Sequence, residues 1–113
     1  MKNELRLYVL VPYNLSPMQQ GIQALHVAVE LGLMDRSDYK EWAKNHKTVI
    51  VLNAGTTGEG SSMEQHLRNL DRLDVSLATF REPDLNNAMT GIAFIVNMND
   101  SLVIGYLKQM GLA

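Results

Sequence analysis

Four short apolar segments of this chain predict four β-strands. Residues 4–11 (ELRLYVLV) alternate at first and then become continuously apolar, which is typical of a buried central strand. Residues 47–53 (KTVIVLN) are rich in β-branched residues, residues 75–81 alternate, and residues 90–97 (TGIAFIVN) form the last apolar run. The pattern therefore favours a sheet of four strands.

The longest helical pattern covers residues 16–33, where Ser16 is a suitable N-cap and Pro17 suits the first helical position. Apolar residues recur at intervals of three and four, as on a helix that packs against other elements. They form a stripe of small residues (Gly21, Ala24, Ala28 and Gly32) and a stripe of larger ones (Ile22, Leu25, Val29 and Leu33). Because so much of its circumference is apolar, we expect this helix to lie in the core, against the sheet.

Three more helices complete the predicted order β-α-α-β-α-β-β-α. One covers residues 38–46 and contains Trp42, a second follows Ser61 with His66 on its exposed face, and a third follows Asp100. The short link between the last two strands permits an antiparallel hairpin, whereas the earlier helical crossovers favour parallel pairing. We therefore expect one α/β domain over residues 1–113, with a mixed four-stranded sheet flanked by helices.

Composition narrows the functional classes. The 113 residues are 46% hydrophobic and 19% charged, with a formal net charge of −2, so no global positive field favours nucleic acid. Cysteine is absent, which excludes disulfides, thiolate metal sites and a cysteine nucleophile. No signal sequence or membrane-spanning run is evident. We expect a cytoplasmic protein without membrane contact, metal ion or cofactor.

Gln19, Gln23 and His26 place polar groups on one edge of the long helix, because they are four and three residues apart. Buried polar side chains are often satisfied structural groups. Three such groups on one edge also suit the wall of a ligand cleft. Both interpretations remain open at this point.

The loop 54–60 (AGTTGEG) lies between a strand and the helix that Ser61 begins, and Ser61 and Glu64 have capping-box spacing. Such loops can bind phosphate at a helix N-terminus. No lysine follows the glycines, and their spacing is not that of a dinucleotide fingerprint. A flexible connection without a ligand is the alternative.

Three stretches resemble the type 2 peptidyl-tRNA hydrolase family. Residues 22–27 (IQALHV) are similar to the family's A-Q-x-x-H-A run, and residues 48–53 (TVIVLN) to its K-V-V-L-K strand. Residues 90–96 (TGIAFIV) are similar to its G-x-x-T-V-L-A-I-G-P ending, with Thr90 matching the family's threonine. The resemblance implies a peptidyl-tRNA hydrolase-like fold and cleavage of the ester that joins a peptide to tRNA.

The chain departs from the family at the catalytic residues. The family's lysine position falls on Gln19, and residues 81–85 (REPDL) replace its D-A-G-x-T turn. Ester hydrolysis needs a base to activate water and a group that stabilises the oxyanion. Glu82 or Asp84 could be the base and His26 a proton carrier, although carboxylates in such a turn also brace the turn itself.

The leading hypothesis is therefore a protein that binds, and in one version sequesters, a small ligand or nucleotide on this fold. Amide and hydroxyl groups would hydrogen-bond a base or ribose, and Arg81 would pair with phosphate, or simply with Glu82 or a surface carboxylate. The expected lining of the cleft is Tyr13, Asn14, Gln19, Gln23, His26, Asn53, Thr56, Thr57, Arg81, Glu82, Asp84 and Thr90.

Two alternatives remain. One is an active hydrolase of peptidyl-tRNA or a related ester, using Glu82, Asp84, His26 and Thr90, with tRNA as its partner. The other is an interaction module that forms a homodimer or a higher homo-oligomer, since seven methionines and an apolar C-terminal helix suit an interface.

Overall fold

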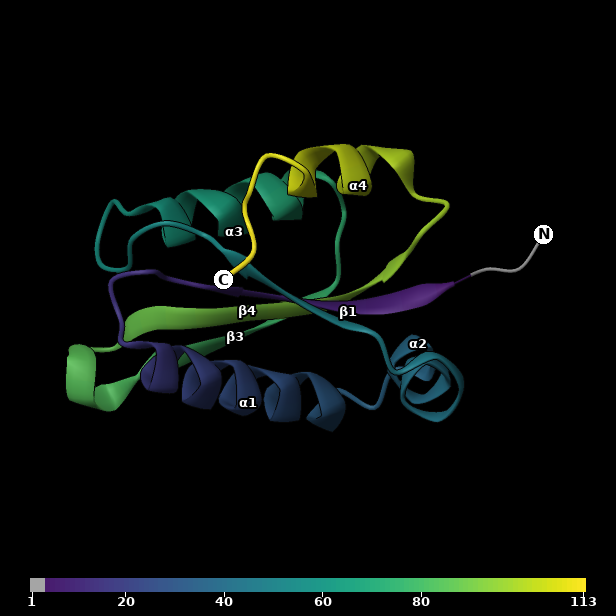
Figure 1. Cartoon of the computed structure of the whole chain (residues 1–113), viewed down its shortest axis with the longest axis horizontal. Coiled ribbons are helices and arrows are strands. Elements are labelled where there is room, and N and C mark those ends of the chain that lie inside the picture. Colours follow the sequence, from purple (N-terminus) through teal and green to yellow (C-terminus); the bar gives the residue numbers. More distant parts are fainter. Residues whose placement is uncertain (1–3) are drawn as a thin grey trace.

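A computed structural model describes residues 4–113. Its single mixed sheet has the strand order β2-β1-β4-β3, with β1 parallel to β2 and the other two pairings antiparallel (Figure 1). The strands are β1 (Leu5–Val11), β2 (Val49–Asn53), β3 (Leu77–Glu82) and β4 (Ala88–Asn97). The predicted strand number, mixed pairing and element order are confirmed.

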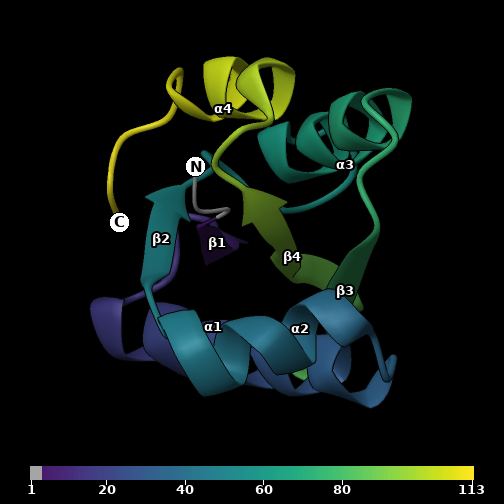
Figure 2. The same cartoon turned by 90° about the vertical axis from the view of Figure 1, so that its right-hand side faces the viewer.

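Helices cover both faces of the sheet (Figure 2). Helices α1 and α2 lie on one face, and α3 and α4 lie on the other. Their bounds are α1 (Pro17–Leu33), α2 (Ser37–Glu41), α3 (Ser62–Arg72) and α4 (Ser101–Leu107), and a π-helical turn (Trp42–His46) continues α2. Between residues 4 and 113, no helix is long and apolar enough to cross a membrane.

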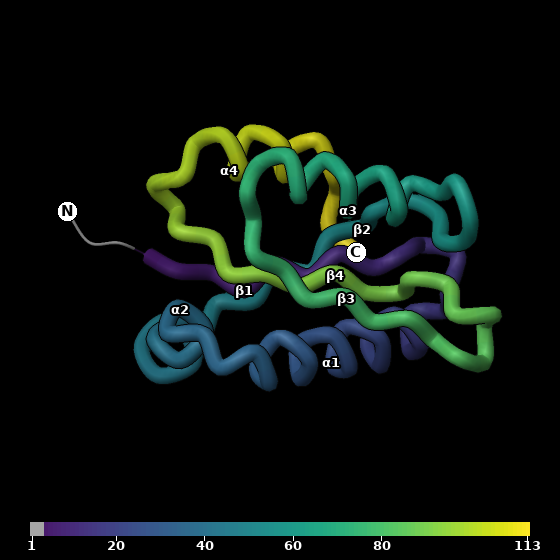
Figure 3. Tube along the Cα trace, turned by 180° about the vertical axis from the view of Figure 1, so that it is seen from behind, coloured from purple at the N-terminus to yellow at the C-terminus, as the bar shows by residue number. Residues whose placement is uncertain are grey.

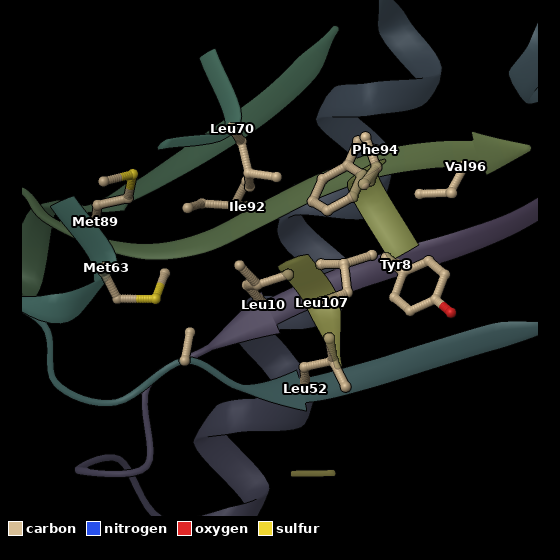
Figure 4. Close-up of a cluster of buried hydrophobic side chains, with 12 residues drawn as sticks. Tyr8, Leu10, Leu52, Met63, Leu70, Met89, Ile92, Phe94, Val96 and Leu107 are labelled. Carbon is tan, nitrogen blue, oxygen red and sulfur yellow. The ribbon is translucent and has the colours of Figure 1, made fainter. Parts of the chain in front are cut away.

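The core is divided by the sheet. Between the sheet and α3 and α4, Leu10, Met63, Leu70 and Phe94 are fully buried and point toward one another (Figure 4). On the other face, a smaller cluster joins α1 to the middle of the sheet through Val9, Val27, Leu31 and Ala93. The inner strands β1 and β4 contribute to both clusters, because successive side chains point to opposite faces.

Gly91 allows α1 to approach β4 closely. A Cβ atom built at Gly91 would lie 2.9 Å from Cβ and Cγ1 of Val27 and 3.3 Å from the carbonyl oxygen of Gln23. Any larger residue would push the helix away from the strand. The absence of a side chain at this position therefore brings the Gln23 side of α1 down onto the sheet.

The expectation that both apolar stripes of α1 are buried is wrong. In the larger stripe, Ile22, Leu25, Val29 and Leu33 are exposed; in the smaller one, Gly21 is exposed and Ala24, Ala28 and Gly32 are half-buried. The buried side of α1 carries Gln23, Val27 and Leu31, which belong to neither stripe. The physical reason is that α1 has the sheet on one side only, and no other element of the described residues 4–113 covers its outer side (Figure 1). A helix in an outer layer can bury only one stripe.

Candidate functional site

The candidate residues lie at one end of the sheet. Strands β1, β2 and β3 end there and β4 begins there, because β4 is antiparallel to both β1 and β3. Helix α1 also begins at this end, beside the turn that joins β3 to β4 (Figure 3). Polar residues that follow different strands are thereby gathered at one edge.

A chain of side-chain hydrogen bonds runs through Gln23. The hydroxyl Oγ1 of Thr90 donates to Oε1 of Gln23 at 2.5 Å, and Nε2 of Gln23 donates to Oε1 of Glu82 at 2.9 Å. Gln23 and Thr90 are both fully buried. Residues 67 and 59 positions apart in the sequence are thus joined inside the protein.

The chemistry of the groups determines the direction of this chain. An ionised carboxylate can only accept hydrogen bonds, so the amide nitrogen of Gln23 must face Glu82. The amide oxygen then faces Thr90, whose hydroxyl must donate. Each of these side-chain groups therefore acts either as a donor or as an acceptor, and the buried Gln23 amide holds the Glu82 carboxylate in place.

Glu82 opens onto a cleft of about 350 Å³. The cleft carries two carboxylates, Glu82 and Asp84, and one amide, Gln19. Its apolar lining is Leu15, Ile22 and Leu85. Among residues 4–113, no positively charged side chain lines it, so the cleft favours ligand groups that donate hydrogen bonds or carry positive charge.

His26 lies outside this cleft. It is exposed on α1, and its ring stacks on Phe80 of β3 with the ring centroids 4.5 Å apart and the planes 8° from parallel. This stacking covers the phenylalanine ring at the edge of the sheet. The three polar residues expected on one edge therefore have separate positions. Gln19 lines the cleft, Gln23 donates a hydrogen bond to Glu82 of the cleft, and His26 covers Phe80.

Arg81 lies in a different hollow from Glu82. The two residues are neighbours on β3, and neighbouring side chains on a strand point to opposite faces. Its Nη1 donates to Oε2 of Glu64 at 3.3 Å and to the carbonyl oxygen of Asn87 at 3.2 Å. It lines a hollow of about 620 Å³, which shares only Leu85 with the cleft at Glu82. Of the partners expected for Arg81, the structure shows a carboxylate, but it is that of Glu64 and not that of Glu82.

The polar residues after β2 hold their own loop. Oδ1 of Asn53 accepts a hydrogen bond from the backbone N–H of Gly55 at 2.9 Å, and the hydroxyl of Thr57 donates to the carbonyl oxygen of Met89. The carbonyl oxygen of Thr56 accepts from the N–H of Met63 at 3.1 Å. These contacts fix the loop to α3 and β4.

Tyr13 and Asn53 line a third hollow of about 360 Å³, beside the residues that follow α4, and Asn14, the neighbour of Tyr13, is exposed. Of the twelve residues expected in one cleft, the structure therefore brings together Gln19, Gln23, Glu82, Asp84 and Thr90. The remaining seven lie in other hollows, in loop contacts or on the surface. Sequence reasoning missed the apolar lining, since it placed Ile22 in the core and gave Leu85 no role.

His66, expected on an exposed face, is half-buried. Its Nδ1 is hydrogen-bonded to the hydroxyl of Tyr106, and the carbonyl of Ala54 lies against the ring as a further partner. Burial lowers the pKa of His66, and the hydrogen bond with Ala54 opposes that shift only in part. The neutral imidazole thus connects α3, α4 and the loop after β2. A tyrosine 40 residues away supplies the contact, which no local pattern predicts.

Within residues 4–113, no group of three or more histidine, aspartate and glutamate side chains is arranged to hold a metal ion. No model of a known protein family matches this sequence, and no curated protein matches it.

Proposed function

We propose that this protein binds a small ligand, with nucleosides and nucleotides as the first class to test, on a peptidyl-tRNA hydrolase-like fold. The observation that carries the proposal is the chain Thr90–Gln23–Glu82, which holds a carboxylate at a cleft. The cleft's volume of about 350 Å³ is within the range of small-molecule sites, roughly 300–1,000 Å³.

Two residues that match the family's motifs support the choice of fold. Gln23 stands in the stretch similar to A-Q-x-x-H-A, and Thr90 matches the threonine of the last motif. The motifs lie far apart in the sequence, yet their side chains are hydrogen-bonded to each other. The resemblance thus pairs two residues that also meet in the structure.

The charge of the cleft indicates which part of a ligand it would take. Carboxylates accept hydrogen bonds from exocyclic amino groups of bases, and they repel phosphate. Because Glu82 and Asp84 line the cleft and Arg81 does not, a nucleotide would enter with its base first. We expect the phosphates to remain outside, on the solvent side of Leu85.

Thermal unfolding with a panel of ligands tests the proposal. The panel contains adenosine, guanosine, cytidine and uridine, their monophosphates, cyclic nucleotides and tRNA. A ligand that binds only the folded protein raises the melting temperature, and saturation at 100 times Kd corresponds to about 2.7 kcal/mol. We expect nucleosides with an exocyclic amino group to stabilise the protein more than uridine, and the ligand to be recovered intact, as sequestration requires.

Glu82→Gln and Glu59→Gln form a matched pair of variants. Both remove one carboxylate, but Glu59 is exposed and lines the hollow that contains Arg81. We expect Glu82→Gln to weaken binding about tenfold or more, the equivalent of one charge-assisted hydrogen bond, and Glu59→Gln to leave it unchanged. Equal effects of the two changes, or no shift with any ligand, would contradict the proposal.

Ester hydrolysis is the second candidate, and the geometry of Glu82 favours it over other reactions. Gln23 donates to Oε1 of Glu82, and among the described residues no donor is hydrogen-bonded to Oε2. A carboxylate held in this way could bind and deprotonate a water molecule. Release of peptide or amino acid from charged tRNA, lost in Glu82→Gln but retained in Glu59→Gln, would establish hydrolysis in place of simple binding.

A further inference from the structure

The outer side of α1 carries an exposed apolar stripe, defined here as Met18, Ile22, Leu25, Val29 and Leu33. Their exposed fractions are 74%, 38%, 67%, 52% and 74%. The intervals of four, three, four and four residues place all five on one side of the helix. This side faces away from the sheet, along the lower edge of the molecule in Figure 1.

The stripe is unusual for a surface because it is nearly free of charge. Glu30 is the only charged residue between positions 17 and 33. Contiguous apolar patches on soluble proteins commonly mark interaction surfaces. A membrane surface is a poor occupant, because helices that lie in an interface carry lysine or arginine on their polar face, and α1 has neither. A strongly charged partner would find no complementary charge.

We propose that the stripe binds the same stripe of a second copy, with the two α1 helices antiparallel. A near-neutral apolar surface is complementary to itself, and a two-fold axis pairs one patch with the same patch. The midpoint of the stripe lies at Leu25, so this residue would meet Leu25 of the second copy. Ile22 would then face Val29 of the second copy, and Met18 would face its Leu33.

The area available fits a weak dimer. Helix α1 has 17 residues and is therefore about 25 Å long. The contact strip has that length and is one helix diameter wide. Its accessible area is about twice the flat area because side chains make the surface uneven, so the two copies together bury on the order of 1,000 Å². This value is the lower limit for a specific interface, so we expect a dissociation constant in the micromolar range.

Gly21 is a second feature that a contact between two α1 helices would explain. Apart from the neighbouring residues and backbone of α1 itself, a Cβ atom at Gly21 would meet no heavy atom of the described residues within 4 Å, so packing within the protomer does not require glycine there. Glycine in a helix interior is less favourable than alanine. At the edge of the stripe, one turn from Leu25, it would let the second helix approach closely.

The dimer would also border the cleft at Glu82, because Ile22 belongs to both the stripe and the cleft lining. The second copy would therefore stand beside the cleft entrance. This dimer does not depend on ligand binding, and it is measured separately.

Sedimentation at protein concentrations from sub-micromolar to hundreds of micromolar tests the proposal. We expect a reversible monomer–dimer equilibrium. Leu25→Glu should weaken it about 100-fold or more, because it places two like charges together at the two-fold axis. Leu102→Glu is the matched control: Leu102 is 74% exposed on α4, away from the stripe, and its change should leave the equilibrium unaltered. A monomer at every concentration, or equal effects of both changes, would overturn the proposal.

Cysteine cross-linking determines the orientation, because the native chain contains no cysteine. In an antiparallel pair, Leu25→Cys should cross-link to itself on mild oxidation, and a mixture of Met18→Cys and Leu33→Cys should form the mixed dimer. Met18→Cys alone should not cross-link. Self-linking at Met18→Cys would indicate parallel helices and would refute the proposed arrangement.

Discussion

Replacing Gln23 by methionine removes both hydrogen bonds of the central amide while keeping a side chain of similar length. Thr90 then loses its acceptor and Glu82 loses its donor. Thr90 is fully buried, so water cannot replace the lost partner, whereas Glu82 is half-buried at the cleft and can be hydrated. Gln23→Met should therefore destabilise the protein chiefly by leaving the Thr90 hydroxyl without a partner.

The magnitude follows from these two losses. A buried hydroxyl without a partner costs about 1–3 kcal/mol, and the bond to a charged acceptor is worth about 1.5–3 kcal/mol before hydration of Glu82 is counted. The expected loss is about 2–5 kcal/mol. Thr90→Val alone should cost about 1–3 kcal/mol, because it leaves Oε1 of Gln23 buried without a donor.

The double variant Gln23→Met/Thr90→Val decides whether the two residues act as a pair. It replaces donor and acceptor together, so no buried polar group of this pair remains unsatisfied. We expect the double variant to be no less stable than Gln23→Met alone, giving a coupling energy of at least about 1 kcal/mol. Urea unfolding of the unchanged protein, the two single variants and the double variant measures this coupling energy, provided that the four m-values are equal. Additive losses, within about 0.5 kcal/mol, would refute the reasoning.

Three further changes test other parts of the structure. Burial lowers the pKa of His66, so the folded state binds the proton less readily than the unfolded chain does. The free energy of unfolding should therefore be at its full value above about pH 6.5 and should fall below that pH. The variant His66→Gln should lack this loss of stability. Gly91→Ala should cost about 1–3 kcal/mol in urea unfolding and, if the proposed ligand site is correct, weaken binding there, because its Cβ would lie 2.9 Å from Val27. Gly55→Ala should lower the melting temperature without changing the cleft at Glu82, since Gly55 has a φ of 91° and its Cβ would lie 2.6 Å from Oγ of Ser62.

The sequence predicted the elements well because each of them has a local signal. Alternating or continuous apolar runs locate the strands, and Ser16, Ser61 and Asp100 cap their helices as their positions suggest. The Ser61–Glu64 capping box is only half formed. The backbone N–H of Glu64 donates to the Ser61 hydroxyl, but its carboxylate binds Arg81. That contact is tertiary, and the local pattern does not contain it.

The burial of α1 shows where periodicity stops being informative. Ile22 and Val27 are both apolar and lie on the same helix, yet one is exposed and the other is fully buried. Hydrophobic spacing indicates that a face prefers to be covered, but it does not say whether a second layer of the same chain will cover it. The number of layers depends on the arrangement of all the elements.

The separation of Arg81 and Glu82 follows from the observed bounds of β3. The predicted strand ended at residue 81, but β3 extends to Glu82, and side chains that alternate along a strand then direct the two residues to opposite faces. Applied to the candidate cleft, this rule places the cation and the carboxylate in separate hollows. The pairing of Gln23 with Thr90 has no local signal in the sequence, because it depends on the approach of α1 to Gly91.

The Gln23 amide is a satisfied buried group, and this fact alone would suit a purely structural role. Such a role is a weak explanation, because two well-packed apolar side chains would stabilise the interior as well as a buried polar pair does. The series of hydrogen bonds from Thr90 through Gln23 ends, moreover, on the carboxylate of Glu82 at a cleft and not on a backbone group. Gln23→Met/Thr90→Val separates the two roles, since it removes the orientation of Glu82 without leaving a buried group unsatisfied. A variant that is stable but no longer binds ligand would show that the network serves the cleft.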